Sequence, residues 1–69
     1  MHLIEITALK RGSVFKLYGE EHYLDLWLDE DVFRARPAHL TSDGYVPFGD
    51  EKTLTIDDLL EGNATLIQA

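Results

Sequence analysis

The chain has 69 residues, of which 45% are hydrophobic, and it carries 13 acidic and 6 basic residues, a net charge of −7 and no cysteine. A chain of this length forms one domain, so we predict a single small β-rich domain over residues 1–69. The missing cysteines exclude disulfides and thiolate metal sites, and the negative charge disfavours direct binding to nucleic acid or to an anionic membrane surface.

The chain's location and partners follow from the same features. No apolar run approaches the roughly 20 residues that a membrane-spanning helix needs. In the first residues, MHLIEITALKRG, the basic pair follows the apolar part, which is the reverse of a secretory signal. Together with the missing cysteines, this order predicts a cytoplasmic protein. Its expected partners are proteins, above all basic ones, because opposite charges attract over long distances.

Two strands are predicted in the first part of the chain. Residues 2–9, HLIEITAL, partly alternate between apolar and polar side chains and predict a first strand. Residues 13–18, SVFKLY, alternate with a period of two and favour β-structure, so they predict a second strand. Glu20 and Glu21 are then expected to form the turn into the next strand.

Residues 23–29, YLDLWLD, predict a strand with one apolar face. Leu24, Leu26 and Leu28 form that face, so the chain's one tryptophan, Trp27, lies on the opposite face between two aspartates. A further alternating run follows over residues 32–39, and Pro37 is expected to end it because proline cannot donate to a strand ladder.

The pairing of these strands can be predicted because a slip of one residue turns every side chain to the other face. With Glu30 and Asp31 as the loop, the expected pairs are Leu28–Phe33, Leu26–Ala35, Leu24–Pro37, Trp27–Arg34 and Asp25–Arg36. The preceding turn gives the pairs Tyr18–Tyr23, Lys16–Asp25, Val14–Trp27, Phe15–Leu26 and Leu17–Leu24. Glu-Glu and Glu-Asp are poor dipeptides for tight turns. The pattern therefore predicts that each loop has an even number of residues, but it does not predict the exact length.

The second half of the chain begins with turn residues. Asp43–Gly44 is a hairpin-type dipeptide, and residues 45–48, YVPF, predict a short edge strand. A short helix is predicted near residues 56–61, because Thr55 is a good N-cap and Gly62 is placed to end it.

The expected fold is mostly β. Residues 64–69 predict a last strand, which gives five or six short strands and one short helix near residues 56–61. This set predicts a small antiparallel meander or barrel. The order resembles that of SH3-like barrels, in which a helical turn also precedes the final strand, although no sequence motif carries the resemblance. An antiparallel sheet packed by the short helix is the alternative.

The sequence shows no constellation typical of catalysis or metal binding. The three histidines, His2, His22 and His39, lie one to a segment, without the close ligand spacing of a zinc site. Residues 29–33, DEDVF, lack the glycine and the distal glutamate of a calcium loop. Neither a nucleophile elbow nor a phosphate-binding glycine loop occurs. We therefore expect a protein that is not an enzyme and that has neither a cofactor nor a metal.

The predicted outer face of the meander combines aromatic and charged side chains, which are types enriched at interface hot spots. Two interpretations of Trp27 stay open: local packing beneath the Arg34 guanidinium, or a contact surface. The candidate partner-binding residues are Tyr18, Tyr23, Trp27 and Arg34. The sequence thus predicts a small non-catalytic module that binds a protein partner, or itself as a homo-oligomer, through this face or an open sheet edge.

Two other functions remain open from the sequence. The acidic residues could mimic a row of phosphates, which predicts an inhibitor of the phage or mobile-element type that occupies the basic groove of a DNA- or RNA-binding protein. The chain could also be an accessory subunit of a larger enzyme or virion. Added salt separates the first two functions, because it weakens charge pairing more than aromatic contacts.

Overall fold

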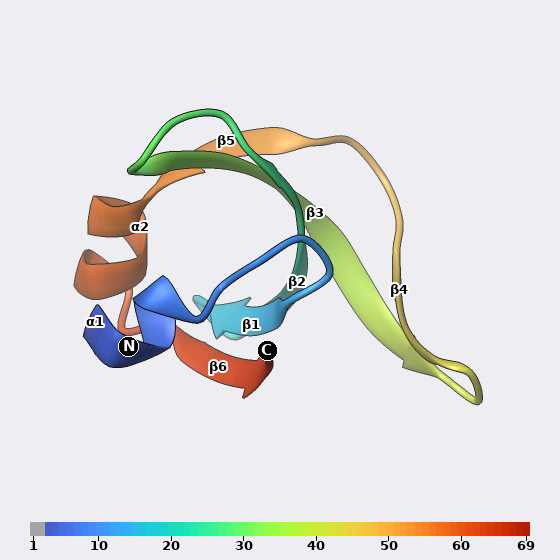
Figure 1. Ribbon diagram of the computed structural model, residues 1–69. Coiled ribbons are helices and arrows are strands. Elements are labelled where there is room, and N and C mark those ends of the chain that lie inside the picture. Colours follow the sequence, from blue (N-terminus) through green and yellow to red (C-terminus); the bar gives the residue numbers. More distant parts are fainter. Residues whose placement is uncertain (1–2) are drawn as a thin grey trace.

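An antiparallel sheet of short strands curls around the hydrophobic interior in the computed structural model, which describes residues 3–69 (Figure 1). The elements are α1 (Leu3–Thr7), β1 (Val14–Leu17), β2 (Glu20–Trp27), β3 (Val32–Thr41), β4 (Gly44–Pro47), β5 (Lys52–Thr55), α2 (Ile56–Glu61) and β6 (Thr65–Gln68). The predicted mostly β, meander-like fold is confirmed. Within residues 3–69, no helix is long and apolar enough to cross a membrane.

The strands lie in the order β4-β3-β2-β1-β6, and β5 also pairs with β3. The first four strands form an antiparallel meander, and β6 returns to pair with β1. The first part of β3 pairs with β5 and its last part pairs with β4. Figure 1 shows the β3–β4 hairpin extending away from the ring formed by the other elements.

The predicted first strand over residues 2–9 is wrong, although residue 2 itself lies outside the described residues. Leu3–Thr7 form the helix α1, and its Ile6 side chain belongs to the core. Leu9 follows the helix in a turn, where its N–H donates to the Ile6 carbonyl at 3.1 Å, and its side chain belongs to the core as well. Packing of Ile6 and Leu9 in the core therefore outweighs the β-favouring composition. The sixth strand is instead Lys52–Thr55, which was not predicted as a strand.

The first hairpin turns two residues earlier than predicted. The observed pairs are Val14–Tyr23, Phe15–His22, Lys16–Glu21 and Leu17–Glu20, so the predicted pairs are wrong. Tyr18 and Gly19 form the turn with φ angles of 52° and 78°, the positive values that a type I′ turn requires. The register is shifted by an even number of residues. The prediction that this loop has an even number of residues is therefore confirmed, and each paired β1 side chain lies on the predicted face.

A β-bulge at Asp25 changes the faces of β2. The observed pairs with β3 are His22–Pro37, Tyr23–Arg36, Leu24–Ala35, Leu26–Arg34 and Trp27–Phe33. One extra residue turns every later side chain over. Leu24 is therefore fully buried, whereas Leu26 and Leu28 are 42% and 49% exposed and Trp27 faces the core. The predicted common face of the three leucines, all the predicted β2–β3 pairs and the predicted even length of the loop between these strands are wrong.

Asp25 itself is held by Arg36. The guanidinium donates from Nε to Oδ2 at 2.7 Å and from Nη2 to Oδ1 at 3.0 Å. These hydrogen bonds lower the pKa of Asp25, so the carboxylate stays charged although the residue is buried. Asp25 and Arg36 are not the ladder pair that was predicted, because Arg36 pairs with Tyr23, but their side chains do form the predicted charge contact.

Pro37 does not end its strand as predicted, because β3 continues to Thr41. The carbonyl of Pro37 accepts a hydrogen bond from the backbone N–H of Phe48 at 2.8 Å. The ladder therefore loses only the bond that the missing proline N–H would have donated. The last part of β3 then forms a hairpin with β4, in which Gly44 has a φ of 104°.

The predicted helix over residues 56–61 is confirmed with its cap. The Thr55 hydroxyl accepts from the Asp58 N–H at 3.3 Å, and the Asp58 carboxylate accepts from the Thr55 N–H at 2.8 Å. This reciprocal capping box places Leu59 in the core with no exposed area. The last predicted strand is likewise confirmed as β6.

The core gathers around aromatic rings from three strands. The Phe33 ring meets Phe15 edge-on at 5.8 Å between centroids and meets Trp27 at 5.1 Å. The buried cluster consists of Ile6, Leu9, Phe15, Leu17, Leu24, Phe33, Ala35, Leu59 and Ala64.

Candidate protein-binding groove

The four candidate contact residues do not share one face. Tyr18 lies in the β1–β2 turn and is 74% exposed. Tyr23 and Arg34 lie on the outer face of the sheet, where Arg34 forms an ion pair with Glu51 at 3.4 Å. Trp27 lies on the inner face. The predicted strand register placed these side chains on one face of the sheet, and that prediction is wrong.

Trp27 packs, but against different neighbours from those expected. Its indole Nε1 donates to the carbonyl of Leu9 at 3.2 Å, and its ring meets Phe33. Because Arg34 points to the opposite face, it cannot stack on the indole as the packing interpretation assumed. The indole is thus fixed at its polar end and packed along its apolar edge.

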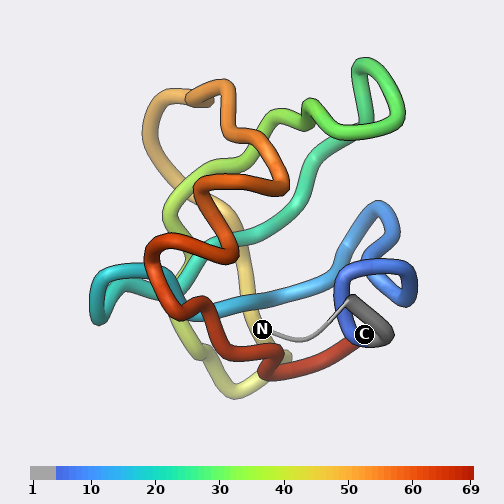
Figure 2. Tube along the Cα trace, turned by 90° about the vertical axis from the view of Figure 1, so that its left-hand side faces the viewer, coloured from blue at the N-terminus to red at the C-terminus, as the bar shows by residue number. Residues whose placement is uncertain are grey.

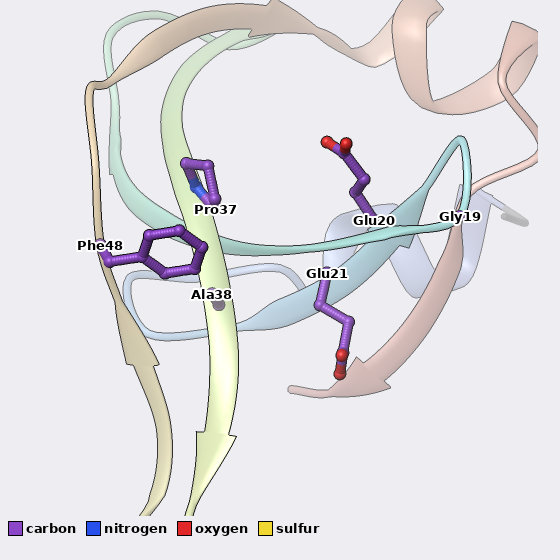
Figure 3. Close-up of a pocket in the computed structure, with 6 residues that line it drawn as sticks. All are labelled: Gly19, Glu20, Glu21, Pro37, Ala38 and Phe48. Carbon is purple, nitrogen blue, oxygen red and sulfur yellow. The ribbon is translucent and has the colours of Figure 1, made fainter.

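A groove of about 410 Å³ opens instead between the β1–β2 turn and the β3–β4 hairpin. It is lined by Gly19, Glu20, Glu21, Pro37, Ala38 and Phe48 (Figure 3). Phe48 is 48% exposed, which is a large apolar surface for a side chain outside the core.

Backbone and side-chain contacts position both walls of this groove, which we call the Phe48 groove. Phe48 is held by its N–H bond to Pro37 and by a ring contact with His39 at 4.9 Å between centroids. An interaction of the Tyr45 hydroxyl with the Glu21 carboxylate raises the pKa of Tyr45. This interaction links the hairpin to β2.

The chemistry of the groove combines aromatic and acidic groups. Figure 3 shows Phe48 beside Pro37 on one wall and the Glu20 carboxylate across from them, while Glu21 points to the other side of β2. A ring face attracts cations, and a carboxylate forms strong charge-assisted hydrogen bonds with ammonium and guanidinium groups. The groove therefore suits a long basic side chain that covers the ring and reaches the carboxylate.

His22 contacts residues of both walls of the groove. It is the ladder partner of Pro37, its Nδ1 lies 2.9 Å from the carbonyl oxygen of Glu20, and its ring stacks on Phe15. The residue is 1% exposed, and its Nε2 is buried without a hydrogen-bond partner among the described residues. Burial lowers the pKa of His22, and the nearby charge of Lys52 lowers it further.

Acidification is expected to destabilise the fold through His22. The unfolded chain binds a proton near pH 6.5, whereas the folded chain keeps the ring neutral to lower pH. The stabilisation is complete above pH 6.5 and is lost as the pH falls below it, by at most about 1.4 kcal/mol per pH unit. Urea unfolding between pH 7.5 and about pH 5 measures this slope, above the range in which Asp25 titrates.

The matched variants for this measurement are His22→Gln, which cannot titrate, and His39→Gln, which removes an exposed histidine. The first is expected to flatten the slope and the second to retain it. An unchanged slope in His22→Gln would show that another group carries the pH dependence.

The residues of the Phe48 groove were not predicted as a site. Phe48 was placed in an edge strand and Glu20 in a turn, although the sequence could have indicated a different place for each. Phe48 lies between Pro47 and Gly49, two turn residues, so an exposed ring could have been expected. Gly19 was a better turn residue than Glu20, which would have placed the acid at the start of β2.

Comparison of the chain with family models, curated proteins and solved structures found no match. Across residues 3–69, no group of three or more histidine, cysteine, aspartate or glutamate side chains is placed to hold a metal ion.

Proposed function

We propose that the protein is a small non-catalytic interaction module that binds a basic segment of a partner protein in the Phe48 groove. The observation that carries this proposal is the half-exposed ring of Phe48 across the groove from the Glu20 carboxylate. The net charge of −7 supports it, because it speeds encounters with basic partners.

The distribution of acids favours this function over a phosphate mimic. Glu20 and Glu21 lie at the start of β2, and Asp29–Asp31 follow its end. Figure 2 shows the β1–β2 turn and the β2–β3 loop on opposite sides of the molecule. An eight-residue strand spans roughly 25 Å, so the two groups do not form one continuous row.

We also propose that the sheet is an SH3-like barrel in a cytoplasmic protein. The layout supports the barrel, because β6 pairs with β1 and the short helix α2 precedes β6. The layout alone does not carry the function, since one fold serves many functions. For that reason the proposed function depends on the groove.

Calorimetric titration with a short basic peptide tests the proposal. The probe is acetyl-Leu-Arg-Leu-Arg-amide, and its control replaces both arginines by citrulline, which keeps the shape and removes the charge. We expect the arginine peptide to bind and the citrulline peptide not to bind. Phe48→Ala and Glu20→Gln are each expected to weaken binding about fivefold, as the loss of one cation–π contact or one exposed charge pair would.

Two variants outside the groove serve as controls for the titration. Leu40→Ala removes an apolar side chain that is 64% exposed, and Glu61→Gln removes an exposed acid from α2. Both are expected to leave the affinity unchanged at constant ionic strength. Equal weakening in Glu61→Gln and Glu20→Gln would point to general charge attraction, and with it to the acidic mimic.

A further inference from the structure

A second hollow, of about 330 Å³, opens near the other end of β2. It is lined by Ile6, Thr7, Leu9, Trp27, Glu30 and Ile56, and we call it the Trp27 pocket. Its walls come from α1, the segment after α1, the last residue of β2, the β2–β3 loop and the start of α2. It shares no residue with the Phe48 groove.

The inner walls of the Trp27 pocket are apolar and fixed. Ile6 and Leu9 are 4% and 5% exposed and belong to the core, while Trp27 and Ile56 pack against it and stay partly exposed. The Nε1 bond to the Leu9 carbonyl holds the indole plane in place. A preformed apolar hollow with an aromatic wall suits an aliphatic or aryl group.

The rim of the pocket is negatively charged. Glu30 is the one charged residue that lines it, and Asp29 and Asp31 lie next to Glu30 in the same exposed loop. The Glu30 N–H donates to Asp29 Oδ1 at 2.7 Å, which orders the loop at this point. Such a rim attracts a cation and repels an anion.

We propose that the Trp27 pocket binds a small amphipathic cation, an alkyl or aryl group that carries one ammonium. The apolar part contacts Trp27 and Ile56, and the ammonium lies at the Glu30 carboxylate. A volume of about 330 Å³ is at the lower end of the range for small-molecule sites, which fits a ligand of a few carbon atoms. This binding is independent of the function proposed for the Phe48 groove.

The chain's only tryptophan makes the test direct, because Trp27 lines the pocket and its fluorescence reports the occupant. The protein is titrated with n-hexylammonium chloride, 1-hexanol and sodium hexanoate at constant ionic strength. We expect a saturable change in emission with hexylammonium, binding about threefold weaker with the uncharged alcohol, and the weakest binding with the anion. The absence of a saturable change, or equal affinity for all three probes, would overturn the proposal.

Two exposed acids provide matched variants. Glu30→Gln removes the carboxylate at the pocket and is expected to abolish the preference for hexylammonium over hexanol. Asp57→Asn removes an acid of α2 that does not line the pocket and is expected to leave the preference intact. If both variants lowered the preference equally, the whole-chain charge would explain it and the site would be refuted. Phe48→Ala is expected to change nothing here, which separates this pocket from the Phe48 groove.

Discussion

Replacing Phe33 by alanine is expected to leave the chain largely unfolded at room temperature. The ring is fully buried and contacts both Phe15 and Trp27. Truncation of a buried phenylalanine costs about 3–5 kcal/mol of unfolding free energy. A core of this size rarely supplies more than about 3–5 kcal/mol of net stability. Circular dichroism and urea unfolding, followed by Trp27 fluorescence, measure the loss.

Leu40→Ala is the control for this substitution, because Leu40 is 64% exposed and its truncation is expected to leave the stability unchanged. Phe33→Leu is expected to lose less than the alanine variant, since most of the apolar volume stays. A Phe33→Ala variant that unfolds cooperatively within about 1 kcal/mol of the parent chain would contradict the central place of this ring in the core.

The second large effect is expected at Gly62, where alanine should cost about 1–3 kcal/mol of unfolding free energy. A Cβ at this position would overlap Leu17 Cδ1 and would lie 2.9 Å from the Asp58 carbonyl oxygen. Leu17 is buried and Asp58 O is backbone, so neither can move away easily. Denaturant unfolding of Gly62→Ala measures this cost.

The cause of the Gly62 effect is steric and not conformational. Its φ of −84° is open to any residue, and it is the following Asn63 that takes the left-handed conformation with a φ of 50°. Asn63→Gly is therefore expected to leave the stability unchanged or raise it slightly. A Gly62→Ala variant as stable as the parent chain would show that the close approach of Leu17 is relieved without cost.

The parts of the fold that could be predicted are those specified by neighbouring residues. Thr55, the acids after it and Gly62 define α2 within one short segment, and the alternation in β1 defines its faces. The bulge at Asp25 could not be predicted, because YLDLWLD has the same period with or without an extra residue. The Asp25–Arg36 contact was predicted from a strand register that is wrong, and it forms nonetheless because opposite charges on facing strands attract.

The candidate site was harder to predict for a physical reason. The Phe48 groove joins Gly19–Glu21 to Pro37 and Phe48, which are separated by long stretches of chain and meet only when the hairpin folds beside β2. The sequence identifies Trp27 as unusual, but its surroundings depend on α1 and on the bulge, and neither was predicted.

The most direct test of the central claim, that a basic segment binds in the Phe48 groove, is an NMR titration of the ¹⁵N-labelled protein with acetyl-Leu-Arg-Leu-Arg-amide. The account predicts that the largest amide shifts occur at Gly19, Glu20, Ala38 and Phe48, and that the citrulline peptide leaves them in place. Shifts centred on Tyr23 and Arg34 would instead place binding on the outer face of the sheet and contradict the account.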